Sequence, residues 1–150
     1  MGLKEKINDN LKSSMKSGDK VRLSTIRSIR ALILEFEKSG AGRELSPEDE
    51  LNLLSSAAKK RKESIEQFEK GGRIELVDQE KHELEIINEF LPKQLSDEEL
   101  FDEIKKIAHE VGASSKADFA KLMPVAAKSF KGKADGKKVK EMVDKLLSGN

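Results

Sequence analysis

The 150-residue chain contains no cysteine, no tryptophan and no tyrosine, and it has only two histidines. The lack of cysteine excludes disulfide bonds, thiolate nucleophiles and cysteine-based zinc sites, and it suits a reducing cytosol. All six aromatic residues are phenylalanine, and charged residues make up 38% of the chain. This composition favours helices with richly charged outer faces over a β-sandwich. A chain of this length can bury one core, or one core and that of a small second domain.

Long apolar segments are missing too. The longest plain apolar run, Ala31 to Leu34, is far too short to cross a bilayer. The amino-terminal residues lack the apolar core of a signal peptide. We therefore expect a soluble, cytoplasmic protein that does not enter a membrane.

The formal net charge is only +1, because 29 lysines and arginines face 28 aspartates and glutamates. A globally basic protein is thereby excluded, so any attraction for nucleic acid has to be local. Single-strand binders usually offer aromatic platforms, whereas the phenylalanines of this chain mostly lie at core spacing. Recognition of a folded RNA by its shape and phosphate positions is the form of RNA binding that this composition leaves open.

Apolar residues recur at helical spacing along the chain, so we predict an all-α fold with two domains. Residues 1–93 are expected to hold four amphipathic helices around one core. The helices are predicted to end at Ser17-Gly18, at Ser39 to Gly42, at Gly71-Gly72 and near Leu91, before Pro92. The residues expected to face the core are Leu3, Ile7, Leu11 and Met15; Val21, Leu23, Ile26, Ile29, Leu32, Ile33 and Phe36; Leu51, Leu54, Ala58, Ile65 and Phe68; and Ile74, Val77, Leu84, Ile87, Phe90 and Leu91. The second helix keeps Arg22, Arg27 and Arg30 outside.

Residues 96–150 are predicted to form a small three-helix domain. Ser96 and Glu99 have the spacing of a capping box, and the helix that they open is expected to stop at Gly112. A second helix follows Ser114-Ser115 and is kinked or shortened by Pro124, and a third begins at Gly136.

A local cluster of lysines lies near the carboxyl end. Between Lys121 and Lys140 the chain has seven lysines and a single acid, Asp135, which is expected to cap the third helix of this domain. Two lysines in the first turn of that helix oppose the helix dipole, and a bound anion would remove this penalty. We therefore predict a phosphate-binding loop, and the alternative is a solvated, lysine-rich turn. The predicted nucleic-acid-binding residues are Lys128, Lys131, Gly132, Lys133, Gly136, Lys137 and Lys138, with Arg22, Arg27 and Arg30 as further candidates.

Few residues are suited to catalysis. Three sets of residues are candidates for chemistry: His82 and His109; Glu83, Glu85 and Glu89; and Ser114 to Lys116. The histidines have no metal-ligand partner at the usual spacing. The glutamates could supply paired carboxylates, but acids interleaved with lysines on a helix favour a solvated face. The spacing of Ser115 and Asp118 fits a helix cap better than a nucleophile. With no phosphate-loop, dinucleotide or nucleophile-elbow motif, we predict no catalytic residue, no metal and no cofactor.

Five stretches in order make the chain resemble the YqeY family, also called GatB/YqeY-domain proteins. They are Leu3 to Asn8 with Lys16 to Arg27, Arg61 to Phe68 before a glycine break, Phe90 to Leu95, Gly112 to Ser115, and Lys131 to Gly136. The resemblance covers essentially the whole chain. Where the family often has Arg between Lys-Gly and Ala-Asp-Gly, this chain has Lys133, a point charge instead of a bidentate fork. The segment Phe119 to Ala127 also differs from the family's usual glycine and methionine pattern.

This resemblance implies two all-helical domains, the second similar to the tail of the B subunit of the tRNA-dependent amidotransferase. That enzyme uses ammonia from glutamine to convert misacylated Glu-tRNA or Asp-tRNA to the amide, and its tail helps to hold tRNA. The family therefore often carries a carbon–nitrogen ligase label with glutamine as amido-N-donor. The kinase and amidase chemistry resides in parts that this chain does not have, so we expect the label to be inherited from the tail.

We therefore expect a protein that binds tRNA, or a tRNA-handling complex, through the lysine-rich loop. A second hypothesis is a protein-interaction adaptor that docks a partner through the acidic segment Asp97 to Glu103 or through its amino-terminal helices. A third is a stand-alone amidotransferase, which predicts glutamine-dependent amide formation by the purified protein.

Overall fold

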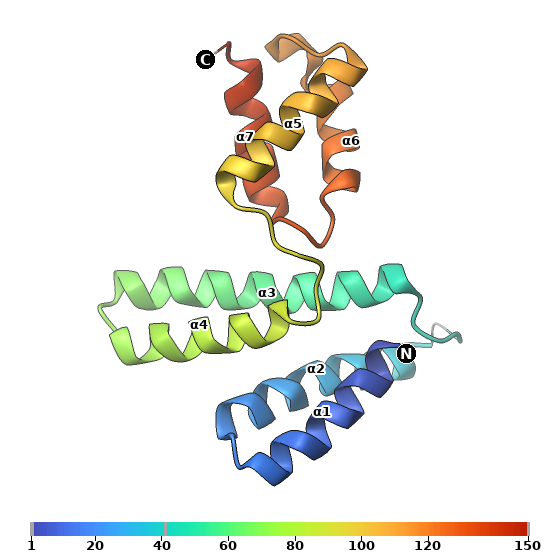
Figure 1. Ribbon diagram of the computed structural model, residues 1–150, viewed down its shortest axis with the longest axis vertical. Helices are drawn as coiled ribbons and strands as arrows, with labels where there is room; N and C mark the ends of the chain where they lie inside the picture. Colours follow the sequence, from blue (N-terminus) through green and yellow to red (C-terminus); the bar gives the residue numbers. More distant parts are fainter. Residues whose placement is uncertain (1, 41, 150) are drawn as a thin grey trace. The chain divides into compact units, whose positions relative to one another are not determined.

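The computed structural model describes residues 2–40 and 42–149, so Ala41, in the predicted break at Ser39 to Gly42, lies outside it. The described residues form α-helices and one short 3₁₀ helix with no strand, which confirms the all-α prediction. The chain divides into two compact units, Met1–Pro92 (unit 1) and Lys93–Asn150 (unit 2), shown in Figure 1. Among the described residues, no helix is both long enough and apolar enough to span a membrane.

Unit 1 is built from two helical hairpins. Helix α1 (Leu3–Ser17) packs on α2 (Lys20–Lys38), and α3 (Pro47–Lys70) packs along α4 (Ile74–Asn88) (Figure 1). Helix α2 also contacts both α3 and α4, so it joins the two hairpins. The core cluster consists of Leu3, Ile7, Ile26, Ile29, Ile33, Leu54, Ala57, Ala58, Ile86 and Ile87.

Local signals set the helix boundaries of unit 1. The carboxylate of Asp19 accepts a hydrogen bond from the Arg22 backbone N–H, and Ser46 and Asp49 cap α3 reciprocally. Helix α1 stops at Gly18, whose φ of 74° is readily adopted only by glycine. Helix α4 ends at Asn88, three residues before the predicted end, and i→i+3 backbone hydrogen bonds then tighten the chain through Leu91.

Two core predictions in unit 1 are wrong. Met15 is 60% exposed, and Ser14 is buried in its place. Steps of four residues turn a helix by about 40° each, so the predicted stripe drifts off the buried face, whereas Ser14 lies two full turns after Ile7. Ile74 is 71% exposed because it is the first residue of α4, beside the turn of the hairpin.

Unit 2 is a three-helix bundle. Helices α5 (Asp97–Val111), α6 (Phe119–Ser129) and α7 (Gly136–Leu147) each pack against the other two, and the 3₁₀ helix η1 (Lys116–Asp118) precedes α6. The predicted capping box at Ser96 and the glycine stop at Gly112 are both present. Helix α6 continues beyond Pro124 to Ser129. The core cluster consists of Leu100, Ile104, Ala108, Leu122, Ala126, Phe130, Val139, Val143 and Leu147.

Candidate nucleic-acid interface

The lysine-rich loop joins α6 to α7 at one end of unit 2. The backbone N–H groups of Lys133 and Ala134 donate to the carbonyl of Phe130, at 2.8 and 3.1 Å, which folds the loop into a tight turn. Asp135 then caps α7, because its carboxylate accepts a hydrogen bond of 3.1 Å from the Lys137 backbone N–H. The predicted cap is therefore confirmed, and this carboxylate already occupies part of the helix start.

The segment before α5 is hydrogen-bonded to this loop. The Leu95 N–H donates to the Lys133 carbonyl at 2.9 Å, and the side-chain amide of Gln94 donates to the Gly132 carbonyl at 2.7 Å. Gly132 is buried, and its φ of 80° is the conformation for which glycine is needed. Glycine is therefore required at position 132 by the turn, and the buried backbone of Gly132 is not accessible to a phosphate. Gly136, by contrast, is exposed at the first position of α7.

Lys138 already has acidic partners. Its ammonium lies 3.5 Å from carboxylate oxygens of Asp97, at the start of α5, and of Glu141, one turn along α7. The charges of Asp97 and Glu141 raise the pKa of Lys138. A phosphate at Lys138 would have to compete with both carboxylates.

The remaining lysines of this region differ in whether they interact with other residues of the chain. Lys128, Lys133 and Lys137 are exposed, and within the described part of the chain their ammonium groups have no hydrogen bond or ion pair. Lys131 is exposed as well, but it takes part in an interaction within the chain. These three residues lie at the end of α6, in the loop and in the first turn of α7, so their chain positions share one end of the bundle (Figure 1). We call Lys128, Lys133 and Lys137 the basic end.

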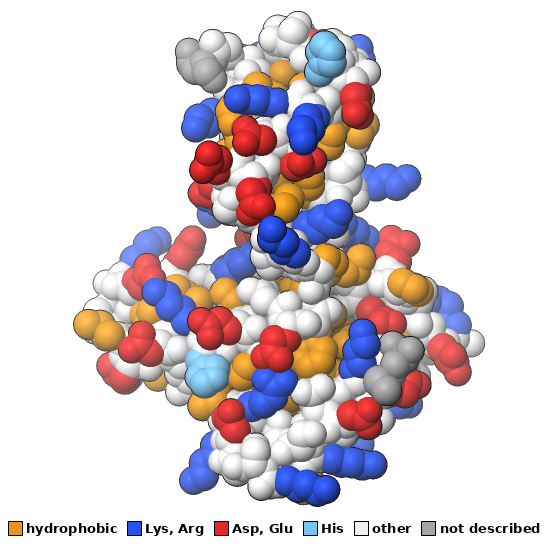
Figure 2. Space-filling model, viewed as in Figure 1, with side chains coloured by type: hydrophobic (Ala, Val, Ile, Leu, Met, Phe, Trp, Pro, Cys, Tyr) orange, Lys and Arg blue, Asp and Glu red, His pale blue; other side chains and the backbone are white. Residues whose placement is uncertain are grey.

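Charges of opposite sign occupy different parts of unit 2. Helix α5 has six acids and two lysines, whereas residues 119–147 have eight lysines and three acids. On the face of unit 2 drawn in Figure 2, acidic side chains gather over α5. The ion pair between Lys138 and Asp97 shows that the acidic start of α5 lies close to the start of α7. The basic end is thus bordered by acids, which limits its affinity for a polyanion.

The serine and lysine segment before α6 has the geometry of a cap. The backbone N–H groups of Ser114 and Ser115 donate to the carboxylate of Asp118, at 2.8 and 3.2 Å. These hydrogen bonds hold the pKa of Asp118 below its usual value. The structure therefore places Ser115 in a capping role.

A buried charge cluster in unit 1 was not predicted. Arg61 of α3 places its Nε 3.1 Å from Glu83 and 3.6 Å from Glu80, both on α4, and its Nη2 donates to the Ser28 hydroxyl. Glu83 is only 7% exposed, so the interpretation of this acid as part of a solvated face is wrong. Burial, followed by the nearby charge of Glu83, raises the pKa of Glu80. The i,i+3 spacing of the two glutamates was the available signal, and it did not reveal Arg61.

Arg22 also proves to be engaged within unit 1. Its guanidinium donates to both carboxylate oxygens of Glu89, at 2.8 and 3.1 Å, and to the side-chain oxygen of Asn10 at 2.6 Å. It ties α2 to α1 and to the residue that follows α4, so the prediction that Arg22 faces outward is wrong. Arg27 and Arg30 are exposed as predicted.

No group of three or more His, Asp or Glu side chains in residues 2–40 and 42–149 is placed to hold a metal ion. The candidate site consists of the exposed lysines of the basic end.

Comparison with known proteins gives the family. The model of the family described as Yqey-like protein matches residues 4–147. This chain belongs to the YqeY-like family.

Two relatives of this YqeY-like chain are fungal. It is 37% identical over 81 residues to "Altered inheritance of mitochondria protein 41, mitochondrial" of Lachancea thermotolerans, covering 54% of this chain and 43% of that protein. It is 33% identical over 90 residues to an uncharacterised protein of Schizosaccharomyces pombe, covering 60% of this chain and 72% of that protein. The match thus spans less than half of the Lachancea protein.

Proposed function

We propose that this YqeY-like protein binds tRNA, or a tRNA-handling complex, through the basic end of unit 2. One observation carries the proposal: three exposed lysines have their chain positions at the same end of the bundle, and none has an acidic partner within the described residues. Lysines arranged in this way neutralise phosphates without reading base sequence.

The structure narrows the set of residues in this proposal. Lys138 is paired with Asp97 and Glu141, and the backbone of Gly132 is enclosed. We therefore assign the main phosphate contacts to Lys128, Lys133 and Lys137. The role is binding rather than catalysis, and we propose that the family's carbon–nitrogen ligase label reflects the similarity of the tail to the amidotransferase subunit. A cytoplasmic location, testable by cell fractionation, belongs to the same proposal.

The test measures tRNA affinity against salt concentration. Three neutralised phosphates should give a slope of log affinity against log salt of roughly −2 to −3. Replacing Lys128, Lys133 and Lys137 by Glu should abolish binding. The matched control replaces Lys12, Lys59 and Lys60 by Glu, because these lysines are exposed on unit 1 and the change of charge is the same. Equal tRNA affinity in the two triple variants would refute the proposal.

The acidic helix α5 supports a second candidate, a protein-interaction adaptor. Its residues Asp97 to Glu103 include five acids, and an acidic surface repels RNA but attracts a basic protein partner. Purification of the protein from cells with and without nuclease treatment separates the two candidates. An adaptor keeps its partner after the treatment, whereas an RNA binder loses what it held through RNA.

A further inference from the structure

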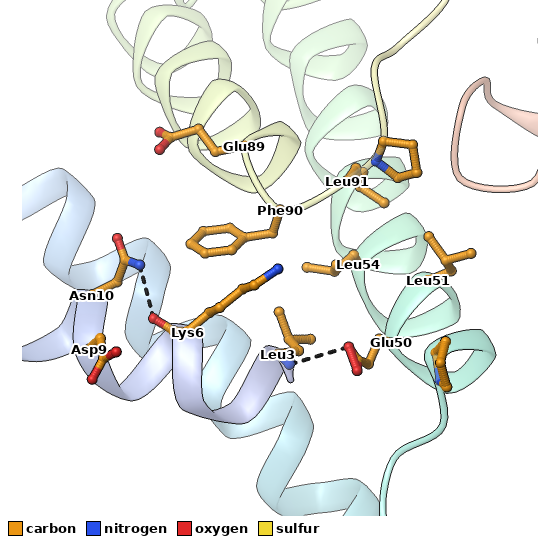
Figure 3. A pocket seen from close by; sticks show the side chains of 12 residues that line it. Leu3, Lys6, Asp9, Asn10, Glu50, Leu51, Leu54, Glu89, Phe90 and Leu91 are labelled. Carbon is orange, nitrogen blue, oxygen red and sulfur yellow. Dashed lines mark hydrogen bonds between the residues drawn. The ribbon is translucent and has the colours of Figure 1, made fainter. Parts of the chain in front are cut away.

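A groove of about 690 Å³ lies in unit 1 between α1, the start of α3 and the end of α4. We call it the α1–α3 groove, and Figure 3 shows it from close by. Its lining residues are Leu3, Lys6, Asp9, Asn10, Pro47, Glu50, Leu51, Leu54, Glu89, Phe90, Leu91 and Pro92. Its volume falls in the range of sites that hold small molecules in proteins.

The packing of unit 1 explains why this groove exists. Helix α1 makes its main contacts with α2, and α3 makes its main contacts with α4. No helix of unit 1 fills the space between α1 and the α3–α4 hairpin at this end. An opening therefore remains where a more regular four-helix bundle would place a helix interface.

The inner surface of the groove is apolar. Leu3 and Leu54 are buried beneath it, and Leu51, Phe90 and Leu91 are half-buried along it. Figure 3 shows Phe90 and Leu54 facing the same central space. Covering these side chains with an apolar group would remove hydrophobic surface from water, which favours binding.

Two of the three acids that line the groove, Glu50 and Glu89, and the amide of Asn10 have hydrogen-bond partners within the chain. Glu50 accepts a hydrogen bond of 3.3 Å from the Leu3 N–H, and Glu89 accepts two from Arg22. The Asn10 side chain accepts from Arg22 and donates to the Lys6 carbonyl at 2.9 Å. The hydrogen bond of Glu50 joins α1 to α3, and those of Arg22 join α2 to α1 and to the residue after α4. Together these contacts limit the space that a ligand can occupy.

Lys6 is the exception. In Figure 3 its side chain extends into the groove, and its ammonium lies between Phe90 and Leu54. Within the described part of the chain this ammonium has no hydrogen bond or ion pair. The carboxylate of Asp9, the remaining acid of the lining, is directed away from it (Figure 3). Lys6 is exposed, so an anionic group that enters the groove from solvent can reach this ammonium.

We propose that the α1–α3 groove binds a small amphiphilic carboxylate, a molecule with one carboxylate group and an apolar chain. The carboxylate pairs with Lys6, and the chain covers Phe90, Leu54 and Leu51. A cationic amphiphile would leave Lys6 unpaired and bring two like charges together.

The probe is octanoate, titrated into the full chain by calorimetry and by amide NMR. We expect saturable binding, with the largest shift changes at the residues of the α1–α3 groove. Lys6→Met should weaken octanoate binding about tenfold, as expected for the loss of a charge-assisted hydrogen bond. The same variant should leave the binding of 1-octanol within about twofold, because the apolar contacts remain. Lys12→Met is the matched control, since Lys12 is exposed on the same helix and does not line the groove.

Three results would overturn this inference. They are an absence of saturable octanoate binding to the unaltered chain, equal losses in Lys6→Met and Lys12→Met, and binding of octyltrimethylammonium as tight as that of octanoate. Binding of an apolar peptide in preference to octanoate would identify a protein-docking groove instead. Circular dichroism of both variants checks that the fold is kept. The test involves unit 1 alone, so its outcome does not depend on the tRNA proposal.

Discussion

The two units use their positive charges in different ways. All six arginines lie in the first 92 residues, and unit 2 has lysine as its only permanently cationic side chain. In unit 1, Arg22 pairs with Glu89, the residue after α4, and Arg61 pairs with Glu83 of α4. In unit 2 the lysines lie mostly on the surface, and Lys128, Lys133 and Lys137 have no partner within the described residues. Arg22 and Arg61 therefore stabilise unit 1 through contacts between its helices, whereas the lysines of the basic end make no such contact within the described residues of unit 2.

The largest expected effect comes from the centre of unit 1. Arg61→Met leaves Glu83 buried without its cation, and it should lower the free energy of unfolding of unit 1 by about 2 to 3 kcal/mol. Because the chain has neither tryptophan nor tyrosine, hydrogen exchange measured by mass spectrometry is the appropriate readout. Protection should fall in α3 and α4 and stay unchanged in α5 to α7. Lys60→Met, at an exposed position of α3, is the control, and equal protection in the two variants would contradict the role of Arg61.

A smaller effect should follow from Arg22→Lys. This variant keeps the charge but loses the fork that holds both oxygens of Glu89 and the side chain of Asn10. We expect a loss of about 1 kcal/mol in the stability of unit 1, measured by thermal unfolding. Arg27→Lys, at an exposed position of the same helix, should have no effect. A similar loss in both variants would mean that the fork of Arg22 is not what holds the helices.

Glu80 offers a test with a pH dependence. Burial raises its pKa in the folded protein, so the folded state holds a proton more tightly than the unfolded state does. Its contribution to stability therefore falls as the pH rises through the pKa of the unfolded state toward that of the folded state. Glu80→Gln should stabilise unit 1 at neutral pH, and the gain should shrink in acid, below the ordinary pKa of a glutamate. A gain that is constant with pH would exclude this explanation.

The smallest effect is expected in unit 2. If the basic end attracts RNA through charge alone, replacing Lys128, Lys133 and Lys137 by Arg should change tRNA affinity by less than about twofold. Filter binding at fixed salt measures this. A tenfold gain in tRNA affinity would show instead that bidentate phosphate contacts matter at the basic end. Arginine would then bind oxyanions through its fork in both units, and the units would differ only in which of them contains arginine.

Features set by neighbouring residues were predictable, and those set by distant residues were not. The caps at Ser46, Ser96 and Asp135 follow from residues within three positions, and all three are present. The exposure of Met15 could have been foreseen, because a spacing of four departs from the helical period. The α4 residues that face the core, such as Ile87, followed from the same period.

The details of the candidate site depended on contacts across the fold. Gly132 is enclosed because Gln94 donates to its carbonyl, and Lys138 is paired because Asp97 lies beside it. Both partners come from before or at the start of α5, some forty positions earlier in the chain. Charge counting along the sequence could therefore locate the lysine cluster but could not tell its free members from its paired ones.

The half-buried Phe90 offers a practical consequence. The chain has no tryptophan or tyrosine, so its intrinsic fluorescence is very weak. A Phe90→Trp variant would place the only indole of the chain on the inner surface of the α1–α3 groove. Changes in the wavelength and intensity of the tryptophan emission would report ligand binding at that groove in real time, without chemical labelling.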